Sequence, residues 1–218
     1  MSGLTLYTNL HSSCAYRVRI ALALKGLDYT SQLVNMAEND GENLQGIQAE
    51  KNPLGFVPML SDGNRVYTQS MAIIEFLDET YPEPILLPVN IRDRAYVRAL
   101  AQMVVSDIQP LNNLRVMNYL EQTLAIDEEQ SQNWYRHWLS EGLQAVEKTL
   151  ASHDQAGEHC CYVNMPTLAD ICLIPQVYDA MRVGCDLEPY PRVRGIYDYC
   201  TSLPAFRSAA PENQPGAV

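Results

Sequence analysis

The chain has 218 residues, 47% of them hydrophobic, which is enough for one large domain or for two small domains that share an interface. Its formal net charge is -11 and its pI is about 4.7, which argues against a nucleic-acid binder, because such proteins carry a basic face. The sequence has neither a run of about 18 apolar residues nor a basic amino-terminal segment leading into an apolar one. We therefore expect no membrane helix, no signal peptide and a cytoplasmic protein.

The first 82 residues alternate between strand and helix patterns. Strand character at 4–9 is followed by a helix that begins at Ser12 or Ser13 and ends near Gly26, then by a strand at 28–36. A polar stretch, 42–52, predicts a loop with one short helix. A hairpin over 56–68 and a helix over 69–81 complete the series. This order predicts a small α/β sheet with helices on both faces.

The pattern becomes helical after the proline-rich linker at 82–88. Residues 91–122 predict one long helix or two, interrupted at Pro110. Further helices are expected over 127–153, 165–183 and 191–203, followed by a loose tail at 210–218. The expected organisation is thus an α/β domain of residues 1–84 and an all-α domain of residues 89–218.

Six cysteines and four histidines are spread along the chain. The cysteines form no C-x-x-C pair and the histidines do not cluster, so we expect reduced thiols and no metal site. Thr167 and Asp170 form T-x-x-D before an apolar run, which predicts a structural capping box. Pro58 lies inside a strand-like run and indicates either an edge strand or bulge, or a cis-proline beside a ligand.

The segment with the clearest chemistry is Ser12-Ser13-Cys14, directly before the first helix. The first N–H groups of a helix lack intrahelical partners and the helix dipole places partial positive charge there. A thiolate at that point would be stabilised, a serine hydroxyl could donate to it, and Cys14 could itself be ionised. The competing interpretation is a plain serine N-cap.

The stretch SSCAYRVRIALALKG resembles the S-S-C-x-[WY]-R-V-R-I-A-L-x-L-K-G motif of zeta-class glutathione transferases, which include maleylacetoacetate isomerase. Further motifs of that family follow in the same order, among them NPLGFVPML, TQSMAIIEFL, DIQPLNNLRV, PTLADICLIPQV and DLEPYP. The related maleylpyruvate isomerases share most of them. The resemblance therefore spans nearly the whole chain.

The resemblance implies a thioredoxin-like domain that binds glutathione, an all-helical domain that completes the substrate pocket, and a homodimer. It implies that Ser12, with Ser13 and Cys14, stabilises the thiolate. It also implies that the backbone at Val57-Pro58 pairs with the glutathione cysteine and that Gln69-Ser70 holds the γ-glutamyl carboxylate. The complete set of expected glutathione contacts is Ser12, Ser13, Cys14, Ala15, Tyr16, Arg17, Asn43, Val57, Pro58, Gln69, Ser70, Gln109, Asn113, Leu114 and Arg115.

The chain departs from the family pattern before S-S-C, where it has His11 in place of the usual arginine. Arginine is a permanent bidentate carboxylate clamp, whereas histidine is largely neutral at pH 7. The residues expected to bind the substrate carboxylates are therefore Arg182, which matches a family arginine, together with Arg115 and His11.

The function that this resemblance implies is cis–trans isomerisation of a maleyl β-diketo acid, either maleylacetoacetate or maleylpyruvate, with glutathione as a cofactor that is returned. Two alternatives remain open. One is a transferase that conjugates small electrophiles or processes α-haloacids, and the other is a glutathione-binding interaction protein with little catalysis.

Overall fold

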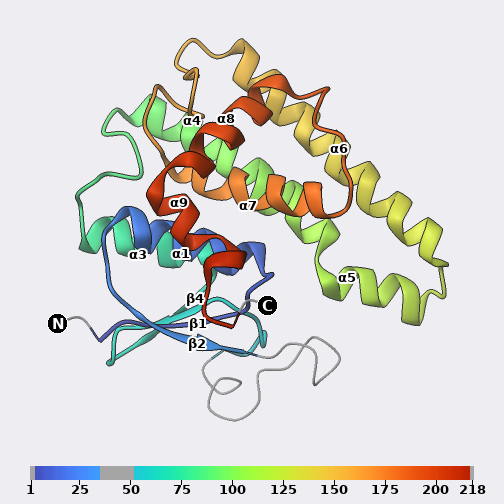
Figure 1. The fold of residues 1–218 in the computed structure, drawn as a ribbon, viewed down its shortest axis with the longest axis horizontal. Coiled ribbons are helices and arrows are strands. Elements are labelled where there is room, and N and C mark those ends of the chain that lie inside the picture. Colours follow the sequence, from blue (N-terminus) through green and yellow to red (C-terminus); the bar gives the residue numbers. More distant parts are fainter. Residues whose placement is uncertain (1–2, 35–51, 217–218) are drawn as a thin grey trace. The chain divides into compact units, whose positions relative to one another are not determined.

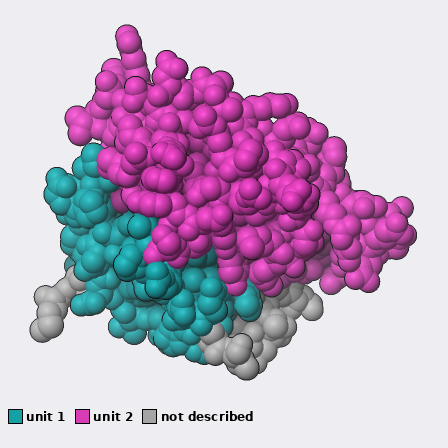
Figure 2. Space-filling view, turned by 45° about the horizontal axis from the view of Figure 1, so that its top comes forward, with its two compact units in different colours: residues 1–85, 203–218 teal, residues 86–202 magenta. Residues whose placement is uncertain are grey.

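The computed structural model describes residues 3–34 and 52–216, and its contacts divide the chain into two compact units (Figure 2). Unit 1 comprises residues 1–85 and 203–218, and unit 2 comprises residues 86–202. The carboxyl-terminal segment from Leu203 thus groups with the amino-terminal unit, whereas the sequence placed it in the helical domain. Among the described residues, no helix is both long and apolar enough to cross a membrane.

Unit 1 is built on a four-stranded mixed sheet with the order β2-β1-β3-β4. Its strands are β1 (Thr5–Thr8), β2 (Thr30–Leu33), β3 (Met59–Ser61) and β4 (Val66–Thr68). β1 runs parallel to β2 and antiparallel to β3, and β3 and β4 form the predicted antiparallel hairpin. Asp62 closes that hairpin, because its Oδ1 accepts hydrogen bonds from the backbone N–H groups of Asn64 and Arg65.

Helices α1 (Ser13–Leu24) and α3 (Ser70–Thr80) lie on one side of this sheet (Figure 1). α1 is buried on nearly every side from Ala15 to Leu22, and Val18, Ile20 and Leu22 are each fully buried. Gly26 follows the helix with a φ of +63°, as expected for a residue that ends a helix in the left-handed region. The short helix expected within 42–52 falls almost wholly outside the described residues, so helices on both faces of the sheet remain a prediction.

The carboxyl-terminal segment forms α9 (Pro204–Ala209) and a short 3₁₀ turn, η4 (Pro211–Asn213), which pack in unit 1. The Asn213 side chain donates to Arg207 O at 2.7 Å, and the Gln214 side chain donates to Ser208 O at 2.7 Å. The expectation of a loose tail from residue 210 is therefore wrong for the described part. Polar side chains that satisfy helix carbonyls fix a segment whose composition suggests disorder.

Unit 2 is helical throughout its regular structure. Its α-helices are α4 (Ile91–Gln102), α5 (Leu114–Asn118), α6 (Glu128–Ser152), α7 (Leu168–Arg182) and α8 (Pro191–Ser202). The predicted capping box starts α7, since Asp170 Oδ2 accepts hydrogen bonds from both the backbone N–H and the hydroxyl of Thr167. That helix is buried along most of its length, as expected of the core helix of a bundle.

The expected helix over 91–122 is broken into pieces of different pitch. α4 passes into a π-helix, η1 (Met103–Ile108), then a 3₁₀ turn, η2 (Gln109–Asn112), and after α5 a second π-helix, η3 (Tyr119–Thr123). Pro110 lies at the start of η2, which confirms the predicted interruption. The wide turns of η1 were not predicted, because they depend on packing against α6.

Candidate functional site

Ser12 is the N-cap of α1. Its Oγ accepts a hydrogen bond from the Ala15 backbone N–H at 3.2 Å, and its backbone is extended. The cap interpretation of this serine is therefore confirmed. It does not compete with a chemical role, because a hydroxyl that accepts one hydrogen bond still has its own proton to donate.

Cys14 lies half-buried in the first turn of α1, next to buried Ser13. A guanidinium nitrogen of Arg17, Nη1, donates to Cys14 Sγ at 3.7 Å. Arg17 itself is 1% exposed. The amino end of α1 thus combines a serine hydroxyl, first-turn N–H groups and a buried positive charge, all of which favour an anion.

Strand register brings two further sequence motifs to the same end of the sheet. Tyr7 on β1 pairs with Met59 on β3, which pairs with Thr68 on β4. β1 leads from there into Ser12, β3 is preceded there by Val57-Pro58, and β4 leads into Gln69-Ser70. Three segments expected to bind glutathione therefore meet at one edge of unit 1.

The backbone at two of these segments is unusual. The Val57–Pro58 peptide bond is cis, as one of the two readings of Pro58 expected. Gln69 occupies the N-cap position of α3 with a φ of +70°, and its side chain makes no capping hydrogen bond. A non-glycine residue held in this region costs of order 1–3 kcal/mol, which points to a functional constraint. Gln69 is exposed and Ser70 is buried at the first position of the helix.

Asn43, another expected glutathione contact, lies outside the described residues. The expected contacts of unit 2 lie around η2 and α5. Gln109 is half-buried, Asn113 is the N-cap of α5 through its bond to the Arg115 N–H at 3.1 Å, and Leu114 and Arg115 are exposed.

Arg182 is the last residue of α7, and its side chain is 48% exposed. Its Nη1 lies 3.6 Å from Asp179 Oδ1 on the same helix. Burial raises the pKa of Tyr135, the nearby Asp179 charge raises it further, and Arg182 opposes that rise. Tyr135 therefore interacts electrostatically with Asp179 and Arg182 within unit 2, and it keeps its proton to donate.

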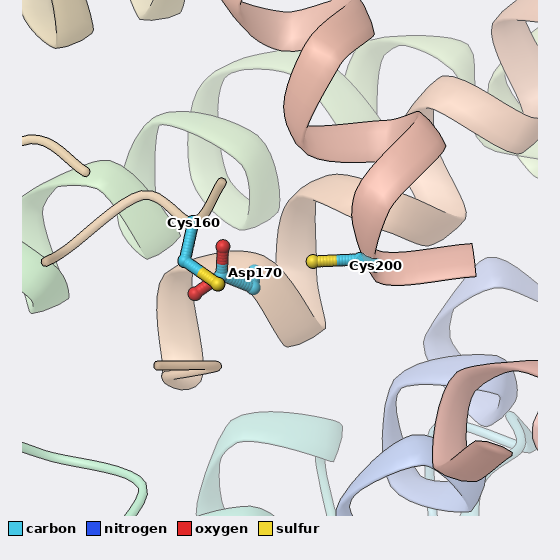
Figure 3. A group of neighbouring side chains, drawn as sticks. All are labelled: Cys160, Asp170 and Cys200. Atoms are coloured by element: carbon cyan, nitrogen blue, oxygen red, sulfur yellow. The ribbon is translucent and has the colours of Figure 1, made fainter. Parts of the chain in front are cut away.

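Cys160, Asp170 and Cys200 form a buried group whose ligand atoms all lie within 4.8 Å of one another (Figure 3). The Asp170 oxygens already accept from the backbone of Cys161 at 2.7 Å and from Thr167. A hydrogen bond with Cys160, and then burial, raise the pKa of the Cys200 thiol. A protonated Cys200 thiol beside a capping carboxylate whose hydrogen bonds are satisfied favours packing over metal binding.

A family model described as "Glutathione S-transferase, N-terminal domain" matches residues 11–80. A probable maleylacetoacetate isomerase of Vibrio cholerae is 45% identical over 217 residues, covering 100% of both chains. The chain belongs to the zeta-class glutathione transferase and maleylacetoacetate isomerase family. The expected fold, a thioredoxin-like domain with an all-helical domain, is therefore confirmed.

Two solved structures of this family extend the comparison. A holo maleylpyruvate isomerase, described as a bacterial zeta-class glutathione S-transferase, is 42% identical with a TM-score of 0.93, covering 98% of this chain and 100% of that one. A maleylacetoacetate isomerase from Anaeromyxobacter dehalogenans, with GSH bound in its active site, is 40% identical with a TM-score of 0.87, covering 99% and 98%.

Sequence reasoning named Arg17 as a glutathione contact but missed its burial. Arg17 lies four positions after Ser13, and residues four apart share one face of a helix. The burial of that face could therefore have been predicted to include Arg17. An arginine in such a stripe is ordinarily expected to extend its charged end to solvent. The buried guanidinium of Arg17, with Nε and Nη2 lacking a hydrogen-bond partner in the described part of the chain, is a feature that only the structure reveals.

Proposed function

We propose that the protein is a glutathione-dependent cis–trans isomerase of a maleyl β-diketo acid, maleylacetoacetate or maleylpyruvate. The observation that carries this proposal is the meeting of Ser12, Pro58 and Gln69 segments at one end of the sheet of unit 1. Near-identical chain length and full coverage against named isomerases support it.

The residues present fit glutathione. Ser12 retains a hydroxyl proton, the first turn of α1 offers N–H groups, and Arg17 adds a buried positive charge beside Cys14. When bound, glutathione supplies a thiol that adds reversibly to the cis double bond, so that the bond can rotate and glutathione is returned. Ser12 then donates a hydrogen bond to the thiolate, with Ser13 and Cys14 completing its surroundings.

The remaining expected contacts would hold and orient the glutathione molecule. We assign the backbone at Val57, just before β3, to pairing with the glutathione cysteine. Ser70 lies at a helix amino terminus, where a carboxylate is stabilised. Gln69 adds a side-chain amide that no capping hydrogen bond occupies.

Substrate recognition requires cations, because the substrate carries two carboxylates. We assign the main role to Arg182, with Arg115 and His11 assisting. Arg182 is half-exposed with one neighbouring carboxylate at 3.6 Å, so its guanidinium retains further donors for an anion.

The proposed function is tested by assaying purified protein with each maleyl substrate, with and without glutathione, while free thiol is counted. Isomerisation that requires glutathione and leaves the thiol count unchanged supports the proposal. Loss of thiol in step with turnover would indicate conjugation, and α-haloacid turnover without isomerisation would indicate haloacid processing, the two activities of the transferase alternative. Glutathione binding without turnover would indicate an interaction protein.

The protein is further proposed to act in the cytoplasm as a homodimer. The family resemblance implies two-fold association, and a two-fold dimer is the commonest closed assembly. Exposed apolar side chains such as Val89 and Ile91, which are 75% and 78% exposed, are compatible with a partner surface.

A further inference from the structure

Helix α1 and its C-cap residue, Lys25, carry three buried cationic side chains, and their surroundings differ. Arg17 and Arg19 are each 1% exposed and Lys25 is 8% exposed. A buried charge is costly unless it is paired or well hydrogen-bonded, so each needs a compensating environment.

Lys25 has that environment. Its Nζ lies 2.6 Å from Asp78 Oδ1 on α3 and donates to Tyr81 O at 2.7 Å and to Pro84 O at 2.6 Å. All three ammonium protons are therefore used, and one of their partners carries the opposite charge.

Arg19 is compensated by polar groups. Its Nε donates to Ala209 O at 2.9 Å, its Nη1 to Thr8 Oγ1 and Asn9 O, and its Nη2 to Leu10 O at 3.1 Å. This side chain joins α9 to the loop that leads into Ser12. Its role is structural.

Arg17 differs from both. Its Nη1 donates to Cys14 Sγ at 3.7 Å, but within the described ranges Nε and Nη2 have no hydrogen-bond partner although both atoms are buried. Nε and Nη2 form one edge of the guanidinium, the fork that would otherwise hold a carboxylate in two parallel hydrogen bonds. Among the residues that the structure describes, a full positive charge is therefore buried without a counter-ion, beside the thiol at the start of α1.

We propose that Arg17 is a positioning residue whose uncompensated charge keeps the thiol of bound glutathione ionised. Such a charge is costly in isolation, and the cost is recovered when an anion forms nearby in a medium of low dielectric constant. Arg17 acts through the electrostatic field at Cys14 and the first turn of α1, without touching the reacting atoms. This inference rests on the proposed glutathione site.

Other charged or titratable groups near α1 also contribute to the electrostatic potential at its first turn. Lys25 and Asp78 neutralise each other, and Arg19 is held by carbonyls. The titratable or charged groups on α1 and directly beside it in the chain are His11, Cys14, Tyr16, Arg17, Arg19 and Lys25. Those on the surrounding elements are Tyr7 on β1, Tyr29 before β2, Glu75, Asp78 and Glu79 on α3, and Arg207 on α9.

The test compares Arg17→Met, Arg17→Lys and the matched control Arg65→Met, an exposed arginine in the β3–β4 turn. Thiolate absorbance of bound glutathione is followed against pH by ultraviolet difference spectroscopy, with S-methylglutathione as a ligand that has no ionisable thiol. We expect Arg17→Met to raise the midpoint of thiolate formation by about one pH unit or more, which is about tenfold in ionisation. Arg17→Lys should recover most of the shift, and Arg65→Met should show none.

Two further readouts separate this role from a structural one. Arg17→Met should lose less affinity for S-methylglutathione than for glutathione, and Tm should be unchanged or higher, because an unpaired buried charge has been removed. An unmoved thiolate midpoint, or a fall in Tm together with equal loss of both ligands, would overturn the proposal. If wild-type protein binds neither ligand, the glutathione function itself fails, which is a distinguishable result.

Discussion

At the scale of single residues, the hydroxyl of Ser12 has two uses that the structure keeps separate. Its lone pair accepts the Ala15 N–H and so caps α1, while its proton remains for an anion at the helix end. Cys14 makes one contact of this kind, as acceptor from Arg17. The two side chains should therefore respond differently to truncation.

We expect Ser12→Ala to lower kcat/KM for the maleyl substrate by on the order of 10²–10³, because a donor to the thiolate is lost. Cys14→Ala should cost less than about tenfold. Asn90→Ala is the matched control, since it removes a similar N-cap from α4 and should lower stability by about 1 kcal/mol without altering kcat/KM. Equal, mild losses in Ser12→Ala and Cys14→Ala, measured by steady-state kinetics, would show that Ser12 is only a cap.

Arg182 gives a second prediction at this scale. Removing a charge-assisted hydrogen bond to a substrate carboxylate costs about 1.5–3 kcal/mol, so Arg182→Ala should lower kcat/KM roughly ten- to a hundredfold or more. Glutathione affinity, measured by calorimetry, should stay within about twofold, because the expected γ-glutamyl contacts are Gln69 and Ser70. Arg194→Ala, an exposed arginine on α8, is the control. A glutathione defect as large as the substrate defect would place the carboxylate clamp elsewhere.

At the scale of elements, the packing of α6 against η1 depends on Gly142. A methyl group at this position would overlap the side chain of Ile108, which is fully buried at the end of η1. Gly195 in α8 is also inside a helix, but a methyl group there would meet open space. Substituting alanine at each glycine therefore distinguishes the effect of helix propensity, which both positions share, from the effect of close packing, which only Gly142 has.

Gly195→Ala should therefore stabilise the protein by about 0.5–1 kcal/mol, the gain in helix propensity. Gly142→Ala should destabilise it by about 1–2 kcal/mol, because overpacking outweighs the same gain. Denaturant unfolding of both variants measures the difference. A stabilised Gly142→Ala variant would show that α6 and η1 are not tightly packed in solution.

Secondary structure was predictable where a pattern depends on neighbouring residues in the chain. The hairpin over 56–68, the cap at Ser12, the stop at Gly26 and the capping box at Thr167 follow from local chemistry, and the structure contains each. The π-helical pitch of Met103–Ile108 and the ordered tail were not predictable. The pitch depends on contacts with a segment distant in sequence, such as the packing of Ile108 near Gly142. The tail is held by the side chains of Asn213 and Gln214 on the carbonyls of α9, which the composition of the segment does not indicate.

The residues of the candidate site were predictable from the sequence, but their arrangement in space was not. Ser12, Pro58 and Gln69 were found through the family motif, whereas their meeting at one end of the sheet follows from the register of β1, β3 and β4. The positive φ of Gln69 has no sequence signal, because glutamine is not a residue type typical of that region. The burial of Arg17, with two nitrogens lacking a partner among the described residues, has none either, because arginine is commonly exposed.

At the scale of the whole molecule, the two ends of the chain form one unit. Helix α9 packs on α1, and Arg19 donates to Ala209 O at 2.9 Å, so unit 1 is completed by the segment that follows Ser202. A fragment that ends at residue 85 would leave this guanidinium and the face of α1 without their partners.

Association is also a property of the whole molecule. Light scattering at micromolar concentration should give twice the chain mass of 24.5 kDa, because we infer a homodimer. The variant Arg65→Met, changed in the exposed turn of the hairpin, is the control and should give the same mass as the wild-type protein. A mass of one chain across that range would refute the dimer.

The most direct measurement of the central claim follows substrate geometry and free thiol in the same sample. Purified protein is mixed with maleylpyruvate or maleylacetoacetate and a substoichiometric amount of glutathione, and the cis and trans vinyl protons are followed by NMR. We predict complete conversion to the fumaryl product over many turnovers per glutathione, with the thiol count unchanged at the end. Conversion that stops when it equals the glutathione added, or that proceeds equally without glutathione, would contradict the account.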